Sequence, residues 1–405
     1  WEQRKLSDTF DFLQNNTLSR ADLDAETGAA KNIHYGDVLI KFGEYLDASS
    51  SALPYIPSQQ IVDKFKSSLL QDGDVIMADT AEDATVGKCT EIAGLHGFPT
   101  ISGLHTIPLR PKERFAPGYL GYYMNSGSYH DQLLPLMQGI KVMSVSKNAI
   151  LNTNISSPVD SDEQAEIGGF FIRLDNLITL HQREYAKLVN IKKSMLEKMF
   201  PKNGSRFPEI RFAGFTDAWE QRKLSSIAEE VTRTDSESTA PVMMITANNG
   251  FIEQSDRYAF NNAGESLKKY ILLEKGEMAY NHGASKLRPY GSCFALTTAE
   301  KARIPFVYHC FSVGDSDPEF ISMELNGSRV ENQLRKIVSS GARMDGLLNI
   351  SYEEYTSIEF MLPSIQEQHL LADYFRKLDN LITLHQRKLE KLKNIKKSML
   401  EKLFV

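Results

Sequence analysis

An internal repeat constrains this chain more than any other feature of its sequence. The stretch WEQRKLS occurs at Trp1–Ser7 and again at Trp219–Ser225. A longer segment, Glu163–Phe200, aligns without gaps to Glu367–Phe404, and 25 of the 38 aligned residues are identical. Between these copies the sequence does not repeat, so one scaffold carries two different inserts. We therefore expect the repeated scaffold to bind the same kind of partner twice and the two inserts to contact different ligands.

The repeat divides the 405 residues into four parts. This length favours two or three domains over a single one. We expect a first insert-bearing domain over 1–157, a central helix over 158–205, a second insert-bearing domain over 206–362 and a distal helix over 363–405.

Both long repeated segments have the capping residues and the apolar spacing of helices. Asp160 and Ser364 each precede a glutamate by three residues, which is the pattern of a capping box at a helix N-terminus. Apolar residues then recur at intervals of three and four, which predicts a coiled-coil seam whose natural partner is the other copy. The predicted seam and docking positions are Leu174, Ile178, His181, Leu188, Leu378, Ile382, His385 and Leu392.

Two polar residues interrupt the apolar seam of each helix. His181 and His385 occupy equivalent seam positions, where we expect a buried polar pair that fixes the register in preference to a metal or catalytic site. Lys192 and Lys396 take the next heptad position, so the seam slides to the isoleucine that precedes each lysine.

The two inserts are predicted to be mixed α/β domains. Several β-rich runs follow a Gly-Asp or Gly-Glu turn, and the expected strands are 38–42, 75–78 and 100–109 in the first insert and 242–247, 270–273, 278–281 and 306–313 in the second. Late in each insert a helix is expected, over 119–138 and 319–340, with an interruption at Asn125 and Asn326. This parallel suggests that the inserts share a fold and differ in surface.

The charge balance argues against a broad basic surface. The formal net charge is −6, each predicted insert domain carries −5, and the distal helix carries +4. Nucleic-acid readers usually have a basic footprint, so affinity for DNA would have to come from local patches or from a basic partner.

Loop clusters of basic and polar side chains are the candidates for contact with DNA. Arginine and asparagine can pair bidentately with guanine and adenine edges, and lysine more often meets phosphates. For any single residue, ordinary solvated loop charge is the competing interpretation. The candidates are Arg110, Lys112, Arg114, Lys141, Ser144 and Lys147 in the first insert, and Asn281, His282, Lys286, Arg288 and Arg343 in the second.

Signatures of catalysis and of metal binding are missing from the sequence. It contains no Asp/Asn-Pro-Pro-Tyr/Phe methylation motif, no Walker A, no HExxH and no GxSxG motif. The three cysteines are scattered without a CxxC pair, which favours a reducing cytoplasm, and no apolar run is long enough for a membrane span. We therefore expect no catalytic residue and no metal site in this chain.

With these features, the chain resembles the specificity subunit of type I restriction–modification systems. The resemblance lies in the WEQRKL start, the Glu-Gln-led helices and the stretches LDNLITLHQR and NIKKSMLEK. The run Pro208–Phe215, leading into Trp219, is also similar. In that family, target-recognition domains alternate with conserved helices, and the match covers the whole chain.

The resemblance implies a function without catalysis in this chain. Two α/β target-recognition domains, related by an approximate two-fold internal repeat, would be separated by two long antiparallel helices that form a coiled-coil spacer. Each domain would read one half of a split, non-palindromic target in double-stranded DNA. Two methyltransferase subunits would dock, and restriction motor–nuclease subunits would join them. S-adenosylmethionine, ATP and Mg would belong to these partners.

Two other interpretations stay open at this point. A tandem-repeat coiled coil could hold two domains apart as a structural scaffold that binds no DNA, although this leaves the two unlike inserts unexplained. A fused restriction subunit with cryptic nuclease activity is the other, and the missing motifs weigh against it.

Overall fold

The computed structural model describes residues 1–202, 204–247, 250–256, 264–338 and 347–404. Contacts divide the chain into two compact units: unit 1 comprises Trp1–Glu184 and His385–Val405, and unit 2 comprises Tyr185–Leu384. Among the described residues, every helix is too short or too polar to span a lipid bilayer.

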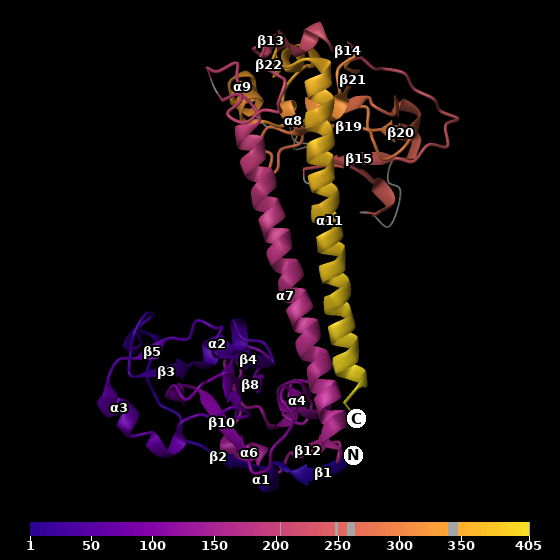
Figure 1. The fold of residues 1–405 in the computed structure, drawn as a ribbon. Coiled ribbons are helices and arrows are strands. Elements are labelled where there is room, and N and C mark those ends of the chain that lie inside the picture. Colours follow the sequence, from indigo (N-terminus) through magenta and orange to yellow (C-terminus); the bar gives the residue numbers. More distant parts are fainter. Residues whose placement is uncertain (203, 248–249, 257–263, 339–346, 405) are drawn as a thin grey trace. The chain divides into compact units, whose positions relative to one another are not determined.

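Two helices of 38 residues each, α7 (Ser161–Lys198) and α11 (Ile365–Lys402), pass from one unit into the other (Figure 1). They begin directly after the two predicted cap residues. The Asp160 carboxylate accepts the Asp162 N–H at 2.9 Å, and the Ser364 hydroxyl accepts the Glu367 N–H at 3.4 Å. The predicted helix starts are therefore confirmed, and the cause is local capping of orphan amides.

Unit 1 is built on a five-stranded sheet with the order β2-β10-β6-β8-β4, in which only β4 and β8 run parallel. A three-stranded sheet (β5-β3-β9) and the pairs β1–β12 and β7–β11 complete it. The strands are β1 (Glu2–Lys5), β2 (Phe10–Phe12), β3 (Ala30–Ile33), β4 (Tyr45–Asp47), β5 (Tyr55–Ile56), β6 (Val75–Ala78), β7 (Thr80–Ala81), β8 (Cys89–Ala93), β9 (Thr100–Ser102), β10 (Thr106–Pro111), β11 (Met143–Ser144) and β12 (Asn154–Ser157). The short helices are α1 (Leu6–Thr9), α2 (Tyr35–Ile40), α3 (Gln59–Asp63), α4 (Tyr119–Tyr123), α5 (Gly127–His130) and α6 (Lys147–Ile150).

The main core of unit 1 joins the sheet to both long helices. Tyr122 of α4 stacks on Phe171 of α7 at 4.8 Å between ring centroids, and Phe171 stacks on Phe404 at 5.7 Å. All three side chains are buried, so Phe404 belongs to the same core as Tyr122 and Phe171.

Unit 2 is built on a four-stranded sheet with the order β14-β21-β18-β19, and the pairs β13–β22, β15–β16 and β17–β20 surround it. The strands are β13 (Glu220–Lys223), β14 (Glu229–Glu230), β15 (Met243–Thr246), β16 (Gly250–Glu253), β17 (Ile271–Glu274), β18 (Met278–Asn281), β19 (Ser292–Ala295), β20 (Lys301–Ile304), β21 (His309–Ser312) and β22 (Glu359–Leu362). The short α-helices are α8 (Pro318–Leu325), α9 (Ser328–Ile337) and α10 (Tyr352–Thr356).

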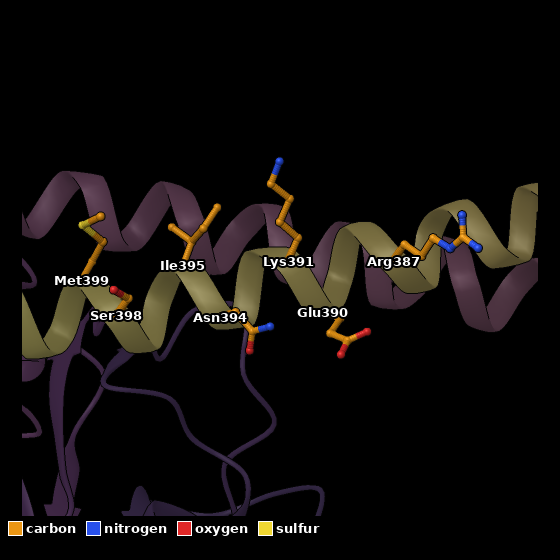
Figure 2. A pocket seen from close by; sticks show the side chains of 7 residues that line it. All are labelled: Arg387, Glu390, Lys391, Asn394, Ile395, Ser398 and Met399. Atoms are coloured by element: carbon orange, nitrogen blue, oxygen red, sulfur yellow. The ribbon is translucent and has the colours of Figure 1, made fainter. Parts of the chain in front are cut away.

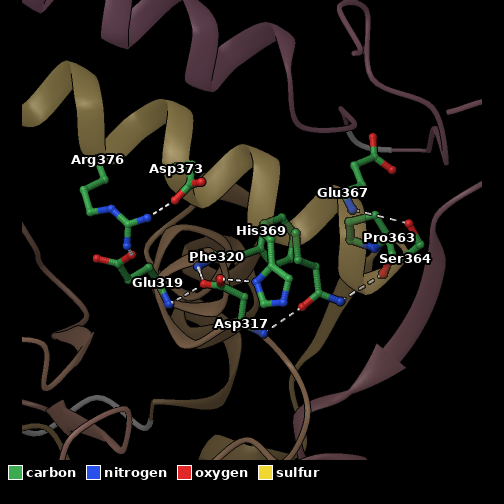
Figure 3. A network of polar contacts seen from close by, with 10 residues as sticks. Asp317, Glu319, Phe320, Pro363, Ser364, Glu367, His369, Asp373 and Arg376 are labelled. Atoms are coloured by element: carbon green, nitrogen blue, oxygen red, sulfur yellow. Dashed lines mark hydrogen bonds and ion pairs between the residues drawn. The ribbon is translucent and has the colours of Figure 1, made fainter. Parts of the chain in front are cut away.

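The N-terminal end of α11 is tied to α8 by a polar network (Figure 3). The Asp317 carboxylate caps α8, accepting the N–H groups of Glu319 and Phe320 at 3.0 Å, and it also contacts His369 at 2.7 Å. Gln368 accepts the Asp317 N–H at 3.0 Å and donates to the Pro363 carbonyl at 2.9 Å.

In unit 1, Gln164 forms the same two kinds of bond as Gln368, accepting the Ala116 N–H at 3.2 Å and donating to the Pro158 carbonyl at 2.9 Å. The two glutamines are equivalent in the repeat. The repeated sequence therefore builds the same joint twice.

Most of the predicted strands exist, and one is wrong. Strands 75–78 and 278–281 coincide with β6 and β18, and both late helices break where predicted, at Asn125 and Asn326. The predicted strand 38–42 is instead covered largely by helix α2. His34 caps that helix, and Asp37 and Lys41 form an i,i+4 ion pair along it, which favours a helical turn over a strand.

Candidate functional site

The two inserts share a frame that one asparagine in each holds in the same way. Asn125 accepts the Cys89 N–H at 3.0 Å and donates to the carbonyls of Cys89 and Gly121 at 2.8 and 2.7 Å. Asn326 accepts the Cys293 N–H at 3.2 Å and donates to the carbonyls of Cys293 and Ser322 at 2.5 and 2.8 Å. Strands β8 and β19 are therefore equivalent.

The strand registers extend this equivalence to the neighbouring strands. Met77 of β6 lies opposite Cys89, and Tyr280 of β18 lies opposite Cys293. Two residues further on, the carbonyl of Asp79 accepts the Val145 N–H at 2.9 Å, and the carbonyl of His282 accepts the Leu348 N–H at 2.9 Å. Asp79 and His282 thus occupy the same place in the two units.

We call this place the strand-end edge. In unit 1 it consists of Asp79, Thr80 and Ser144, and in unit 2 of His282, Gly283 and Leu347, since Thr80 is bridged to Ser144 and Gly283 to Leu347. The backbone pairing is the same, and the side chains are different at each position. The backbone frame is therefore the same in both units at the place where the side chains differ.

In unit 1 the strand-end edge borders a polar pocket of about 260 Å³. Its lining residues are Asp79, Thr80, His105, Leu136, Gln138, Ser144, Val145 and Ser146. Two predicted lysines lie nearby in the chain: Lys141 is exposed, and Lys147 donates to the Leu13 carbonyl at 3.2 Å. Burial lowers the pKa of Lys147, and the negative charge of Asp79 opposes that change.

In unit 2 the same edge is closed by internal hydrogen bonds. His282 is buried, and its two ring nitrogens lie 2.7 Å from the carbonyl oxygens of Leu348 and Val307. Asn281 donates to the Ile245 carbonyl at 3.1 Å and accepts the Gly283 N–H at 2.9 Å. These two predicted residues therefore hold the backbone at the edge.

The remaining predicted residues of unit 2 differ in exposure. Lys286 is exposed, whereas Arg288 is half-buried and donates to the Asn326 carbonyl at 2.6 Å. Burial lowers the pKa of Arg288, and the charge of Glu331 opposes that effect. Arg343 lies outside the described residues.

The basic cluster of the first insert has mostly internal contacts. Arg110 forms a bidentate ion pair with Asp74 at 2.7 and 2.9 Å and also donates to the Leu69 carbonyl. Lys112 donates to the Ser7 carbonyl at 2.8 Å. Arg114 is exposed. Of these three, Arg110 has its guanidinium engaged by another side chain, whereas Lys112 and Arg114 are both exposed.

The seam residues of the long helices point toward other protein groups in each unit. In unit 1, Leu174 and Ile178 are buried, and the Nδ1 atoms of His181 and His385 lie 3.0 Å apart. In unit 2, Leu188 packs against a core cluster that contains Leu378. Ile382 and Leu392 are half-buried.

The seam lysines are paired in a way that sequence reasoning missed. In unit 1, Lys396 lies 2.7 Å from Asp175 and 2.6 Å from Glu44. In unit 2, Lys192 lies 2.5 Å from Asp379. The aspartates and the lysines are repeat equivalents, so each lysine meets the aspartate of the other helix. The signal was present, because both residue types lie in the identical stretches.

Each long helix also carries the same outward pattern. Leu177 and Leu180 of α7 are 46% and 52% exposed, and their repeat equivalents Leu381 and Leu384 of α11 are 44% and 46% exposed. Figure 2 shows a shallow groove along α11, lined by Arg387, Glu390, Lys391, Asn394, Ile395, Ser398 and Met399. All of these except Glu390 recur at the matching positions of α7.

In the part of the chain that the structure describes, no group of three or more His, Cys, Asp or Glu side chains is arranged to hold a metal ion. Cys89, Cys293 and Cys310 are buried, and burial raises the pKa of each thiol.

Comparison with known proteins agrees with this architecture. No family model matches the chain. Over an alignment 424 positions long, it is 21% identical to the protein assigned as the type I restriction enzyme MjaX specificity subunit of Methanocaldococcus jannaschii, and the alignment covers 99% of this chain and 92% of the relative. The solved S subunit of a type I restriction–modification system from M. genitalium matches with a TM-score of 0.56 and 11% identity, over 100% of this chain and 96% of that one. The HsdS subunit from Thermoanaerobacter tengcongensis matches with a TM-score of 0.44 and 16% identity over 100% and 96%. The resemblance seen in the sequence is thus confirmed: over nearly its whole length the chain is similar to a type I restriction enzyme specificity subunit, and it has the fold of a solved S subunit.

Proposed function

We propose that this chain is the DNA-recognition subunit of a type I restriction–modification complex and reads a bipartite, non-palindromic target, one half with each insert. The observation that carries the proposal is the strand-end edge. Equivalent asparagines, Asn125 and Asn326, fix the same frame, and the side chains at the edge differ at every position. A structural scaffold that binds no DNA would not require the same backbone frame to carry different side chains at its edge.

The two edges offer different chemistry to a DNA groove. The edge of unit 1 presents a carboxylate, hydroxyl groups and the nearby exposed Lys141. At the edge of unit 2 the His282 ring is engaged by two backbone carbonyls, and the exposed Lys286 follows it in the chain. Because base edges are read by their donor and acceptor patterns, unlike edges would select unlike sequences. The net charge of −6 implies that partner subunits supply much of the contact with phosphates.

The helices serve, in this proposal, as an antiparallel coiled-coil spacer and as a docking surface. The exposed leucines and the groove residues occur once on α7 and once on α11. Two copies of one surface suit two copies of one partner. We assign this partner as the methyltransferase subunit. S-adenosylmethionine, ATP and Mg would be bound by the methyltransferase and restriction subunits, and this chain would catalyse no step.

The docking assignment is tested by the number of methyltransferase subunits that the full chain retains. The variants are Leu177→Lys, Leu381→Lys and the double variant, because these side chains are exposed. We expect each single variant to retain one methyltransferase and the double variant none, measured by native mass spectrometry of the co-expressed complex. Two copies retained by the double variant would contradict the assignment.

A matched control separates docking from folding. Leu378 lies one helical turn before Leu381 and is only 8% exposed, within the core of unit 2. Leu378→Lys places a charge in that core and is expected to destabilise unit 2 by about 3 kcal/mol or more. Leu381→Lys is expected to leave the melting temperature almost unchanged.

DNA recognition is tested by exchanging one insert. Replacing residues 8–157 with the insert of another specificity subunit is expected to change one half of the methylated target and leave the other half as it was. A change in both halves would contradict the assignment of one half to each insert.

A further inference from the structure

We propose that the polar pocket at the strand-end edge of unit 1 reads an exocyclic amino group of a DNA base, with the carboxylate of Asp79 as the acceptor. The group would be N4 of cytosine or N6 of adenine, presented in the major groove. This inference rests on the proposed function and names the chemistry by which the first insert selects its half of the target.

The geometry of the pocket orients Asp79 and leaves part of it available. The Thr80 hydroxyl donates to Asp79 Oδ1 at 2.7 Å, and His105 Nδ1 lies 3.4 Å from the same oxygen. Among the described residues, the side-chain contacts of Asp79 all fall on Oδ1. Asp79 Oδ2 therefore remains to accept a hydrogen bond from a ligand. The side chains of Asp79 and His105 are 26% and 46% exposed, so the pocket is reached from outside.

His105 is held in an uncommon backbone conformation. Its φ is +54°, in the left-handed region that residues other than glycine rarely adopt. The surrounding structure maintains it: the Asp79 N–H donates to the His105 carbonyl at 3.1 Å, and the ring meets the edge of Tyr35 with centroids 5.2 Å apart. Backbone strain of this kind gathers at ligand sites, because it persists only where neighbours over-determine the geometry.

The ring orientation adds a second acceptor. His105 Nδ1 lies 3.4 Å from the Thr80 hydroxyl oxygen. Because the Thr80 hydroxyl donates its hydrogen to Asp79, its oxygen accepts from Nδ1–H of a neutral imidazole, which makes Nε2 an acceptor. The pocket thus presents a carboxylate oxygen and an imidazole nitrogen, and the hydroxyls of Ser144 and Ser146 at its lining can accept or donate.

An acceptor-rich pocket discriminates among bases by their donor pattern. In the major groove, cytosine N4 and adenine N6 are donors, whereas guanine O6 and N7 and thymine O4 are acceptors. A carboxylate would attract the former and repel the latter. The equivalent place in unit 2 lacks this chemistry, since His282 is engaged by two carbonyls and Gly283 has no side chain. The inference is therefore specific to one position in one half of the target.

The test uses the full chain co-expressed with its methyltransferase subunits, and the target is determined by mapping methylated adenines in host DNA. Asp79→Asn keeps the shape and replaces one acceptor oxygen by a donor. We expect one position, in the half read by the first insert, to accept a carbonyl-bearing base with its relative preference raised roughly tenfold. The other half is expected to be unchanged.

Two further variants make the outcome decisive. His105→Gly suits the left-handed backbone and removes the imidazole, and we expect it to weaken discrimination at the same position. Asp63→Asn makes the same charge change on α3, outside the pocket lining, and is the control.

The outcomes separate this inference from the proposed function. A wild-type complex that methylates no bipartite motif would overturn the proposed function itself. A bipartite wild-type motif that is unaltered at every position by both Asp79→Asn and His105→Gly would overturn only the inference about the pocket, as would changes in both halves.

Discussion

The seam lysines of the two long helices give the most discriminating stability prediction. Lys396 is identical in sequence context to Lys192, yet the two lie in unequal surroundings. Lys396 contacts both Glu44 and Asp175, and the Tyr122 hydroxyl donates to the same aspartate at 2.7 Å. Among the described residues, Lys192 forms its ion pair with Asp379 alone. We predict that Lys396→Met destabilises unit 1 more than Lys192→Met destabilises unit 2.

The magnitude follows from burial. The side chains of Lys396, Glu44 and Asp175 are 17%, 16% and 29% exposed, so removing the lysine leaves two mostly buried carboxylates unpaired. Breaking a fully buried pair costs about 3–5 kcal/mol, and we expect about 2–3 kcal/mol for this partly buried one. The second pair is more exposed, with Lys192 at 31% and Asp379 at 51%, and we expect at most about 1 kcal/mol there.

Thermal unfolding followed by tryptophan fluorescence measures both changes. The chain has two tryptophans, Trp1 in unit 1 and Trp219 in unit 2, so Trp219→Phe and Trp1→Phe backgrounds report one unit each. For a unit of about 200 residues, the expected loss corresponds to a fall of about 5–10 °C for Lys396→Met and at most about 4 °C for Lys192→Met. Adding Glu44→Gln to Lys396→Met is expected to restore about 1 kcal/mol. Equal falls for the two methionine variants would refute the argument from burial.

Two further predictions concern polar side chains inside the two units. Asn125→Ala and Asn326→Ala each remove three hydrogen bonds to backbone groups. Each is expected to lower the free energy of unfolding, measured in urea, by about 2 kcal/mol. A loss of stability in only one unit would mean that the frames are not equivalent. Burial raises the pKa of Glu324 to about 8 from its ordinary 4.5, an effect that the charge of Arg329 opposes. The native state therefore holds the proton that the unfolded state releases, so this group stabilises the fold below pH 4.5 and loses that contribution as the pH rises to about 8. Glu324→Gln is expected to flatten the fall in stability over this range, and an unchanged slope would show that Glu324 is already ionised in the folded protein.

Sequence reasoning succeeded where the signals are local. The period of the apolar residues, the cap residues Asp160 and Ser364 and the breaks at Asn125 and Asn326 all act within a few residues along the chain. The strand predicted at 38–42 is wrong for a local reason as well. His34 caps the helix and Asp37 forms an ion pair along it, and these contacts favour a helix although the apolar run is short enough for a strand.

The candidate site could be predicted only in part, since it depends on contacts between distant residues. Arg110 looks like a surface base in sequence, but Asp74, 36 residues away, engages its guanidinium. The equivalence of Asp79 and His282 follows from strand register, which no repeat in the sequence reveals. His105 carries no motif at all, and only its backbone angle and its place in the pocket mark it.

The most direct measurement of the central claim is the methylation pattern that the chain confers. The chain is co-expressed with its methyltransferase subunits in a host without adenine methylation, and the methylated adenines are mapped by single-molecule sequencing. We expect a motif of two unrelated halves at a fixed spacing, present only when this chain is present. A soluble complex of the chain with active methyltransferase that leaves no sequence-dependent methylation would contradict it.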